Sequence, residues 1–196
     1  AYFSLTNLRH SQHWKTVLAT AETHDFEDVE GLLDLLVGFY YSFWIAGYTA
    51  EKIKKPSRKI ISMIKDGASL RSIEDRLNRK KLRESVPERM SQTLHEDLYD
   101  GSPESWLVPL LKALEYQRAT EVGDPIIEGV ELHVEHILPK AEGVVGDDGI
   151  GYWKERFTVE EARELKHKLG NLVLLEGNYN KRAQTRPFPV KREIYT

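Results

Sequence analysis

Two stretches, HVEHILPK at residues 133–140 and LGNLVLLEG at residues 169–177, decide the predicted fold of the second half of this chain. In the first, β-branched and charged residues roughly alternate up to Pro139, and this pattern predicts a β-strand over residues 131–137. The second is a short apolar run that predicts another strand over residues 171–175. Between them we expect a glycine-rich loop at residues 141–151 and a helix over residues 159–168 that is capped by Thr158. After the second strand, the chain turns into a polar segment that we expect to be helical.

The first 120 residues have a different pattern. Their apolar residues recur at three- and four-residue steps, and turn residues separate the segments, as is typical of amphipathic helices. Ser57 and Ser69 are candidate helix caps, and Gly123-Asp124-Pro125 predicts a turn where the pattern changes. We therefore predict a mainly α protein with a helical region at residues 1–125 and a strand-containing region at residues 126–196. The expected helices of the first region cover residues 11–24, 29–46, 59–65, 73–82, 87–98 and 105–120.

Composition excludes several classes of protein. Hydrophobic residues make up 40% of the 196 residues, and no apolar run approaches the roughly eighteen residues that would span a bilayer. The chain has no cysteine, so it can form neither a disulfide framework nor a thiolate zinc site, and this fits the expected cytoplasmic location. The first residue is alanine and not methionine, so we expect further sequence upstream.

The net charge of -3 hides an uneven distribution of charge. Residues 52–83 contain twelve lysines and arginines against the three acidic residues Asp66, Glu74 and Asp75. We call this segment the basic stripe. It is compatible with a surface that faces phosphates, and equally with a solvated helical face.

The first stretch places a carboxylate and an imidazole side by side. Glu135 and His136 come at the end of the predicted strand, immediately before Ile137-Leu138-Pro139, and would supply a hard metal ligand and a base. Amide side chains in the segment NYNKR at residues 178–182 could complete such a site, which would suit Mg²⁺ or Mn²⁺ better than zinc. Each residue alone has an ordinary structural explanation, because a Glu-His pair is usually a satisfied surface pair and an asparagine often caps a turn. Their order and contexts together favour a functional site.

These motifs carry a resemblance to a known family. Residues 131–188 resemble the ββα-metal core of His-Me finger (HNH) nucleases, in which a Glu-His or Asp-His pair followed by Ile-x-Pro is joined to an Asn-Leu-x-Leu strand and then a helix. More narrowly, HVEHILPK, LGNLVLLEGNYNKR and the Arg-Pro-Phe at residues 186–188 resemble the C-terminal nuclease domain of GmrSD-type modification-dependent restriction enzymes, which include the SspE-like proteins of phage defence. The motifs cover about a third of the chain.

The resemblance implies a role for each matching residue. His136 corresponds to the general base, Glu135 and Asn180 to the metal ligands, and Asn171 to the asparagine that braces the loop and orients the base. Lys181 and Arg182, next to Asn180, are candidates to grip DNA phosphates, with plain solvent exposure as the alternative. The implied cofactor is Mg²⁺ or Mn²⁺, with other divalent metals also open.

The sequence departs from the better-known pattern in two ways. Asn180 stands where many members have histidine, which leaves the identity of the metal open. About thirty residues separate the first two motifs, so the segment that contains Trp153 is a candidate lid or DNA contact, with packing in the core as the more ordinary role. His133 shares the strand face of Glu135 and is either its partner or structural. The remaining histidines show no ligand spacing and stay unassigned: His10, His13, His24, His95 and His167.

The leading hypothesis is a metal-dependent endonuclease that nicks DNA as the effector of a phage-defence or modification-dependent restriction system. The resemblance implies that a separate N-terminal nucleotide-hydrolysing domain selects the target, and no membrane partner is expected. The alternative from another class is a non-catalytic module that binds nucleic acid or docks a partner. A phosphodiesterase acting on RNA or small nucleotides would use the same site.

Overall fold

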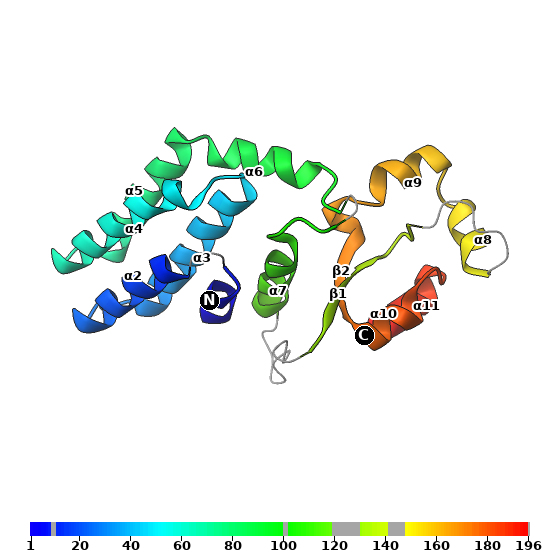
Figure 1. Cartoon of the computed structure of the whole chain (residues 1–196), viewed down its shortest axis with the longest axis horizontal. Helices are drawn as coiled ribbons and strands as arrows, with labels where there is room; N and C mark the ends of the chain where they lie inside the picture. Colours follow the sequence, from blue (N-terminus) through cyan, green and yellow to red (C-terminus); the bar gives the residue numbers. More distant parts are fainter. Residues whose placement is uncertain (9–10, 100–101, 119–129, 141–147, 196) are drawn as a thin grey trace. The chain divides into compact units, whose positions relative to one another are not determined.

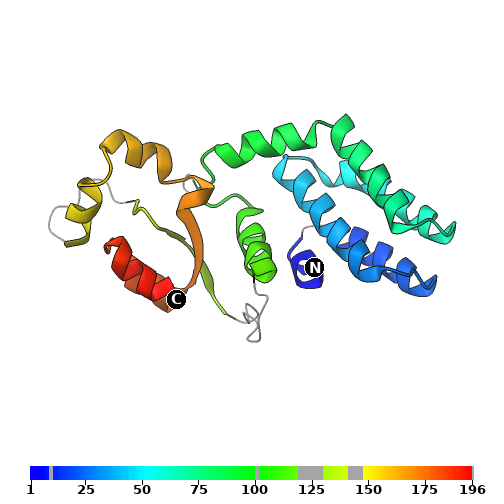
Figure 2. The same ribbon diagram turned by 180° about the vertical axis from the view of Figure 1, so that it is seen from behind.

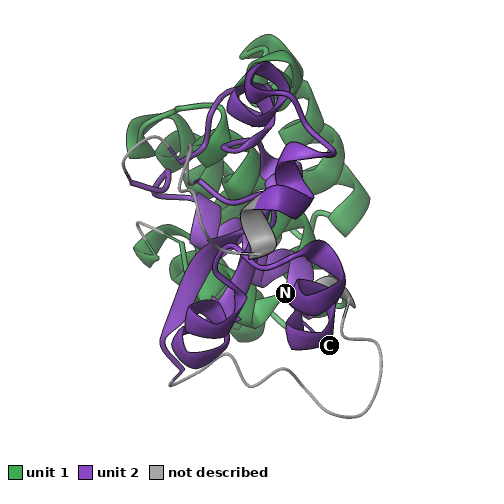
Figure 3. Cartoon of the chain, turned by 90° about the vertical axis from the view of Figure 1, so that its right-hand side faces the viewer, with its two compact units in different colours: residues 1–93 green, residues 94–196 purple. Residues whose placement is uncertain are grey.

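A computed structural model describes residues 1–8, 11–99, 102–118, 130–140 and 148–195. It divides into two compact units, residues 1–93 and residues 94–196, which Figure 3 distinguishes by colour. The boundary that we predicted at residues 125 and 126 lies outside the described residues. Helix α7, which we predicted for the helical region, lies in the same unit as both strands.

The first unit is built from helices (Figure 1). Their buried apolar side chains form its core. Helix α2 packs against α3 and α4, and α3 packs against α5. Leu36, Phe39 and Ile60 are completely buried and belong to its core. The helices of this part of the chain are α1 (Tyr2–Thr6), α2 (Gln12–Thr23), α3 (Val29–Ile45), α4 (Ala50–Lys65), α5 (Leu70–Arg83) and α6 (Val86–His95), the last of which crosses the boundary between the units.

Helix α4 is much longer than the segment that we predicted at residues 59–65. It begins at Ala50 and continues through Pro56, although an interior proline costs a helix about 3 kcal/mol. Ile53, Ile60 and Ile64 lie on one buried face, and their burial offsets that cost. Ser57, which we expected to cap a helix, instead lies in the middle of α4, so that prediction is wrong.

Polar side chains on α3 are buried together with their partners. The hydroxyl of Tyr40 shares a hydrogen bond with Ser57 Oγ at 2.8 Å, and Tyr41 donates to the carbonyl of Ser4 at 3.0 Å. Burial raises the pKa of Tyr40 to about 12, so this hydroxyl stays protonated. Ser69 caps α5 by accepting from the backbone N–H of Ser72, as predicted.

The second unit is centred on a pair of antiparallel strands, joined by a long segment that contains helices, which we call the hairpin. Strand β1 (Leu132–His136) pairs with β2 (Leu172–Glu176), so that Glu135 lies opposite Val173 and His136 opposite Leu172. Helix α7 lies on one side of the hairpin, and α10 and α11 lie on the other, as Figures 1 and 2 both show. The unit's other elements are α7 (Leu107–Arg118), α8 (Asp148–Lys154), α9 (Val159–Leu165), the 3₁₀ turn η1 (Leu169–Asn171), α10 (Gly177–Ala183) and α11 (Phe188–Tyr195).

The connection between the strands is partly different from the prediction. Residues 148–151, which we expected to be loop, form the start of α8, while residues 141–147 lie outside the described part. Thr158 does cap α9: it accepts from the N–H of Glu161, whose carboxylate accepts from the N–H of Thr158 in return. The described residues are mainly helical with one two-stranded sheet, so the mainly α part of the predicted fold class is confirmed. Within the described residues, no helix is both long and apolar enough to cross a membrane.

Candidate active site

The end of β1 carries the Glu-His pair that the sequence singled out. Both side chains are buried: 7% of Glu135 and 5% of His136 is exposed. The contacts of the two side chains come from different elements: Glu135 contacts Lys191 near the end of the chain, whereas His136 contacts the rings of Tyr99 and His167. Their surroundings therefore differ, and each must be described separately.

The imidazole of His136 packs between two other rings. The Tyr99 ring lies 4.9 Å away and the His167 ring 5.5 Å away between centroids, both roughly perpendicular to it. Within the described part of the chain, its buried Nε2 has no hydrogen-bond partner. A buried nitrogen without a partner costs about 1 to 3 kcal/mol, so it is the kind of atom that a ligand or water would satisfy.

The electrostatic environment keeps this imidazole neutral. Burial is the largest cause that lowers the pKa of His136 to about 3, and the neighbouring Lys140, His167, Lys191 and Lys166 act in the same direction. Lys140 stacks its ammonium over the Tyr99 ring at 3.7 Å. The surroundings of His136 are thus rich in cations, which suits an anionic ligand such as a phosphate.

Glu135 is held by a lysine from the last helix. Lys191 on α11 is completely buried, and its Nζ donates to Glu135 Oε1 at 2.6 Å and to the backbone carbonyl of His136 at 2.7 Å. Burial raises the pKa of the Glu135 carboxyl, and the Lys191 ammonium opposes that rise. Burial likewise lowers the pKa of Lys191, opposed by Glu135. The pair has the geometry of a short, charge-assisted hydrogen bond.

Sequence reasoning missed both Lys191 and His167. Lysine is almost never fully buried unless it is paired, so nothing in the segment FPVKREIY indicated that Lys191 would be internal. His167 was left unassigned because it showed no ligand spacing, yet it packs against His136 from 31 positions further along the chain. Both contacts exist only because separate elements converge on β1.

Asn171 fixes the chain that follows β1. Its Oδ1 accepts from the N–H of Leu138 at 2.6 Å, and its Nδ2 donates to the carbonyls of Leu138 at 3.0 Å and Lys166 at 2.8 Å. The side chain is buried. It therefore connects the Ile137-Leu138-Pro139 segment to the end of α9 with three hydrogen bonds.

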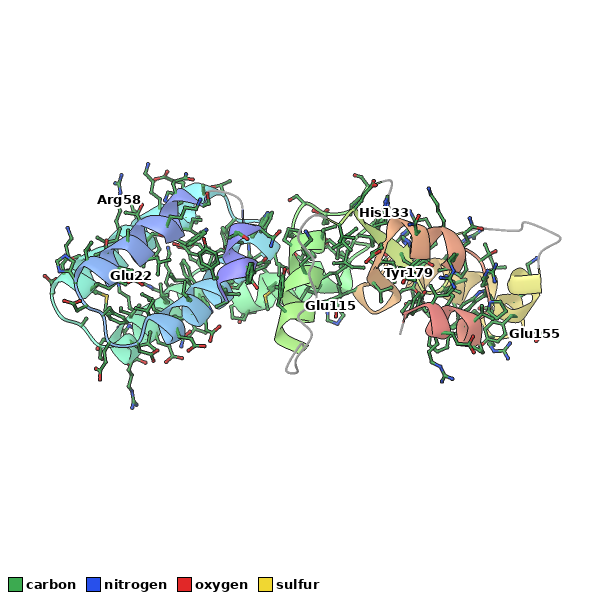
Figure 4. The ribbon with its side chains drawn as sticks, turned by 90° about the horizontal axis from the view of Figure 1, so that it is seen from below. Glu22, Arg58, Glu115, His133, Glu155 and Tyr179 are labelled. Atoms are coloured by element: carbon green, nitrogen blue, oxygen red, sulfur yellow. The ribbon has the colours of Figure 1, made fainter. Side chains whose placement is uncertain are left out.

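Asn180, Lys181 and Arg182 lie on α10, which packs against both strands. Asn180 is half-buried, and Lys181 and Arg182 are exposed, with the guanidinium of Arg182 5.6 Å from the Tyr179 ring. Tyr179 is labelled on this helix in Figure 4. Among the described residues, no hydrogen bond joins Asn180 to Glu135 or to His136. That part of the chain also holds no group of three His, Asp or Glu side chains close enough to bind a metal.

Two further candidates have structural partners. Trp153 is buried, and its indole N–H donates to the carbonyls of Thr185 and Arg186. It therefore packs inside the second unit, which is the more ordinary of the two roles that we considered for it. His133, labelled on β1 in Figure 4, is partly exposed and contacts Glu131 at 3.3 Å.

On fold alone, the chain is a mainly helical protein whose second unit carries a β-hairpin followed by two short helices. Comparison with known families is more specific. Residues 68–196 match the family described as GmrSD restriction endonucleases, C-terminal domain, and the chain belongs to this family. It is thus related to restriction endonucleases, whose substrate is DNA. No curated protein and no solved structure matches the chain.

Proposed function

We propose that this chain is a metal-dependent DNA endonuclease domain of the HNH type that nicks its substrate, with His136 as the general base. The observation that carries the proposal is the buried Nε2 of His136, which is neutral and has no hydrogen-bond partner among the described residues. An enzyme gains from such an atom if a reacting water supplies the missing hydrogen bond.

The chemistry follows from that position. His136 Nε2 accepts a proton from a water molecule whose oxygen attacks the phosphorus of a phosphodiester. The ester P–O bond opposite the attacking oxygen breaks, and the leaving alcohol oxygen takes a proton from solvent water. A pKa of about 3 makes the free imidazole a weak base. An incoming phosphate would offset the positive charges of Lys140 and Lys166, which are among the causes of the low pKa, and so would raise that pKa. Binding of the substrate would therefore activate the base.

The residues present fit a divalent metal only in part. Lys191 occupies Oε1 of Glu135, so Oε2 would be the oxygen offered to the metal, together with the amide oxygen of Asn180. Hard oxygen donors of this kind suit Mg²⁺ or Mn²⁺. When bound, such an ion would offset the charge that develops on the phosphate.

Lys191 and Asn171 would act as positioning residues. Lys191 holds both the Glu135 carboxylate and the carbonyl of His136, while Asn171 fixes the backbone immediately after His136. Together they define where β1 ends, and with it the direction of the imidazole. Lys181 and Arg182 are exposed on α10, where they would contact phosphates beside the cleaved bond.

The family supports a role in restriction, and the resemblance of the motifs extends this to phage defence. We infer that an N-terminal nucleotide-hydrolysing domain of the same protein recognises the target DNA and controls cleavage. Without that domain, the present chain would nick with little dependence on base sequence, because its candidate contacts are to phosphates.

The direct test is nicking of supercoiled plasmid with Mg²⁺ or Mn²⁺. We expect His136→Ala to reduce the rate at least about 100-fold, as loss of a general base does. His133→Ala is the matched control, because His133 lies on the same strand but is partly exposed and paired with Glu131. Nicking by His136→Ala at the wild-type rate would refute the proposed mechanism.

The close packing of His136 favours one second candidate, a non-catalytic module that binds nucleic acid or docks a partner. A side chain only 5% exposed and enclosed by Tyr99 and His167 could simply be part of the core. DNA binding that persists in EDTA, with no cleavage under any divalent metal, would support this candidate. Loss of phage protection in cells that carry a stably folded His136→Ala variant would count against it.

A further inference from the structure

A pocket between α4 and α5 in the first unit has a cationic rim and an apolar floor. Leu77, which is buried, and Pro56 supply the floor. The other lining residues all carry positive charge, and no carboxylate lines the pocket: Lys55, Arg76, Lys80 and Arg83. We call these four residues the rim.

Three of the four rim cations are not neutralised by a neighbour. Lys80 pairs with Glu84, which also binds Lys52 at 2.8 Å. Hydrogen bonds from Lys52 and Lys80 lower the pKa of Glu84 to about 2, so this carboxylate is charged but already shared. Lys55, Arg76 and Arg83 form no ion pair with any residue in the described part of the chain.

The spacing of the rim arranges these charges in a row. Arg76, Lys80 and Arg83 lie four and three positions apart on α5, so they share one face of the helix and extend over about 10 Å. Lys59 follows Lys55 by one turn on α4 and is also exposed. Arg58, labelled in Figure 4, projects from the same helix. The rim is therefore part of a longer basic surface.

We propose that this pocket is a phosphate-binding site for the backbone of double-stranded DNA and supplies affinity that does not depend on sequence. The inference rests on the proposed nuclease function, which it extends to a second contact surface in the other compact unit. A row of unpaired arginines and lysines matches successive phosphates, because arginine donates two parallel hydrogen bonds to a phosphate. The apolar floor can accept the edge of a deoxyribose.

This role predicts a salt dependence. Each phosphate contact releases counterions, so that the logarithm of the binding constant falls with the logarithm of the salt concentration by about 0.9 per contact. Removing the three unpaired rim cations should therefore reduce the slope by about 3. It should also weaken binding at least about tenfold at low salt.

The experiment compares three triple variants of the present chain in a His136→Ala background with EDTA. The test variant is Lys55→Gln/Arg76→Gln/Arg83→Gln. The control, Lys54→Gln/Lys65→Gln/Arg71→Gln, removes the same charge from the basic stripe but spares the rim. Fluorescence anisotropy with a 30-base-pair duplex gives the binding constant between 50 and 200 mM salt. A third variant, Lys55→Arg/Arg76→Lys/Arg83→Lys, keeps the charges and controls for folding.

We expect the first variant to lose affinity and slope, and the second to stay near the wild-type chain. The third should keep the slope, because its charges are retained, but should lose part of the affinity, because lysine cannot donate two parallel hydrogen bonds to one phosphate. Equal losses in the first two variants would show that overall charge and not the pocket is responsible, which would overturn the inference. So would wild-type binding by the first variant. A nicking assay with His136 intact separates this failure from failure of the proposed function. If the wild-type chain nicks plasmid but the variant without the three rim cations binds DNA as well as the wild type does, only the inference is refuted. If the wild-type chain never nicks plasmid, the proposed function is refuted.

Discussion

The tyrosines on α3 and the Glu-His pair at the end of β1 are buried to nearly the same degree, with 4% to 7% of each residue exposed. On α3, each hydroxyl finds one neutral partner, Ser57 Oγ for Tyr40 and the carbonyl of Ser4 for Tyr41. At the end of β1, a buried ion pair lies beside an imidazole nitrogen without a partner among the described residues. The first arrangement stabilises a helical core. The second is costly, and its cost is understandable if the site binds something charged.

The largest effect should come from removing the cation of the buried pair. Lys191→Met leaves the Glu135 carboxylate buried without its partner and should lower the free energy of unfolding of the second unit by about 3 to 5 kcal/mol. Hydrogen exchange of the β1 and β2 amides would measure this loss. Lys191→Met/Glu135→Gln should recover much of it, because no charge then remains unpaired. If Lys191→Met lowers the free energy of unfolding by no more than the loss of one neutral hydrogen bond does, the ion pair at the end of β1 is no more critical than the hydroxyls on α3.

The second effect is the pH dependence of the same unit, measured in EDTA. The pKa of His136 is about 3 in the folded chain against an ordinary value of 6.5, so below pH 6.5 the unfolded chain binds a proton that the folded chain does not. Stability due to the neutral imidazole is complete above pH 6.5 and is lost as the pH falls, by about 3 kcal/mol at pH 4. His136→Asn should flatten this part of the profile. An identical profile in the variant would show that His136 titrates normally.

A smaller effect is expected at the loop that follows β1. Asn171→Ala removes three hydrogen bonds to backbone groups and should cost about 2 kcal/mol in the second unit. Asn171→Asp keeps the acceptor for Leu138 N–H but loses both donors, so it should lie between the wild type and the alanine variant. Equal stability of all three, measured by urea unfolding, would contradict a bracing role.

The smallest effect belongs to α3. Tyr40→Phe removes one neutral hydrogen bond, while Ser57 keeps its bond to the carbonyl of Ile53, so the loss should be about 1 kcal/mol. Hydrogen exchange of the α3 and α4 amides, together with the thermal unfolding temperature, would detect this loss of stability. A loss comparable with that of Lys191→Met would mean that the hydroxyls on α3 are as critical as the ion pair.

Local patterns predicted the parts of the fold that local forces decide. The capping box of Thr158 and Glu161 and the cap at Ser69 are formed by residues three positions apart, so one short stretch of sequence contains both partners of each cap. The strand at residues 131–137 was predicted nearly to its ends, because the alternation of its side chains reflects a sheet with two different faces. Helix α4 was mostly missed, because the local penalty of Pro56 is visible in the sequence and the burial that outweighs it is not.

The candidate site shows the same division. The sequence by itself determined that a carboxylate and an imidazole end a strand, that an asparagine precedes the next strand, and that a basic stripe lies in the helical part. Only the tertiary structure decided that Lys191, 56 positions after Glu135, becomes that carboxylate's partner, and that His167 packs on His136. The physical reason is that burial and ion pairing depend on which distant elements converge, and the free energy of such contacts is not carried by any short stretch of chain.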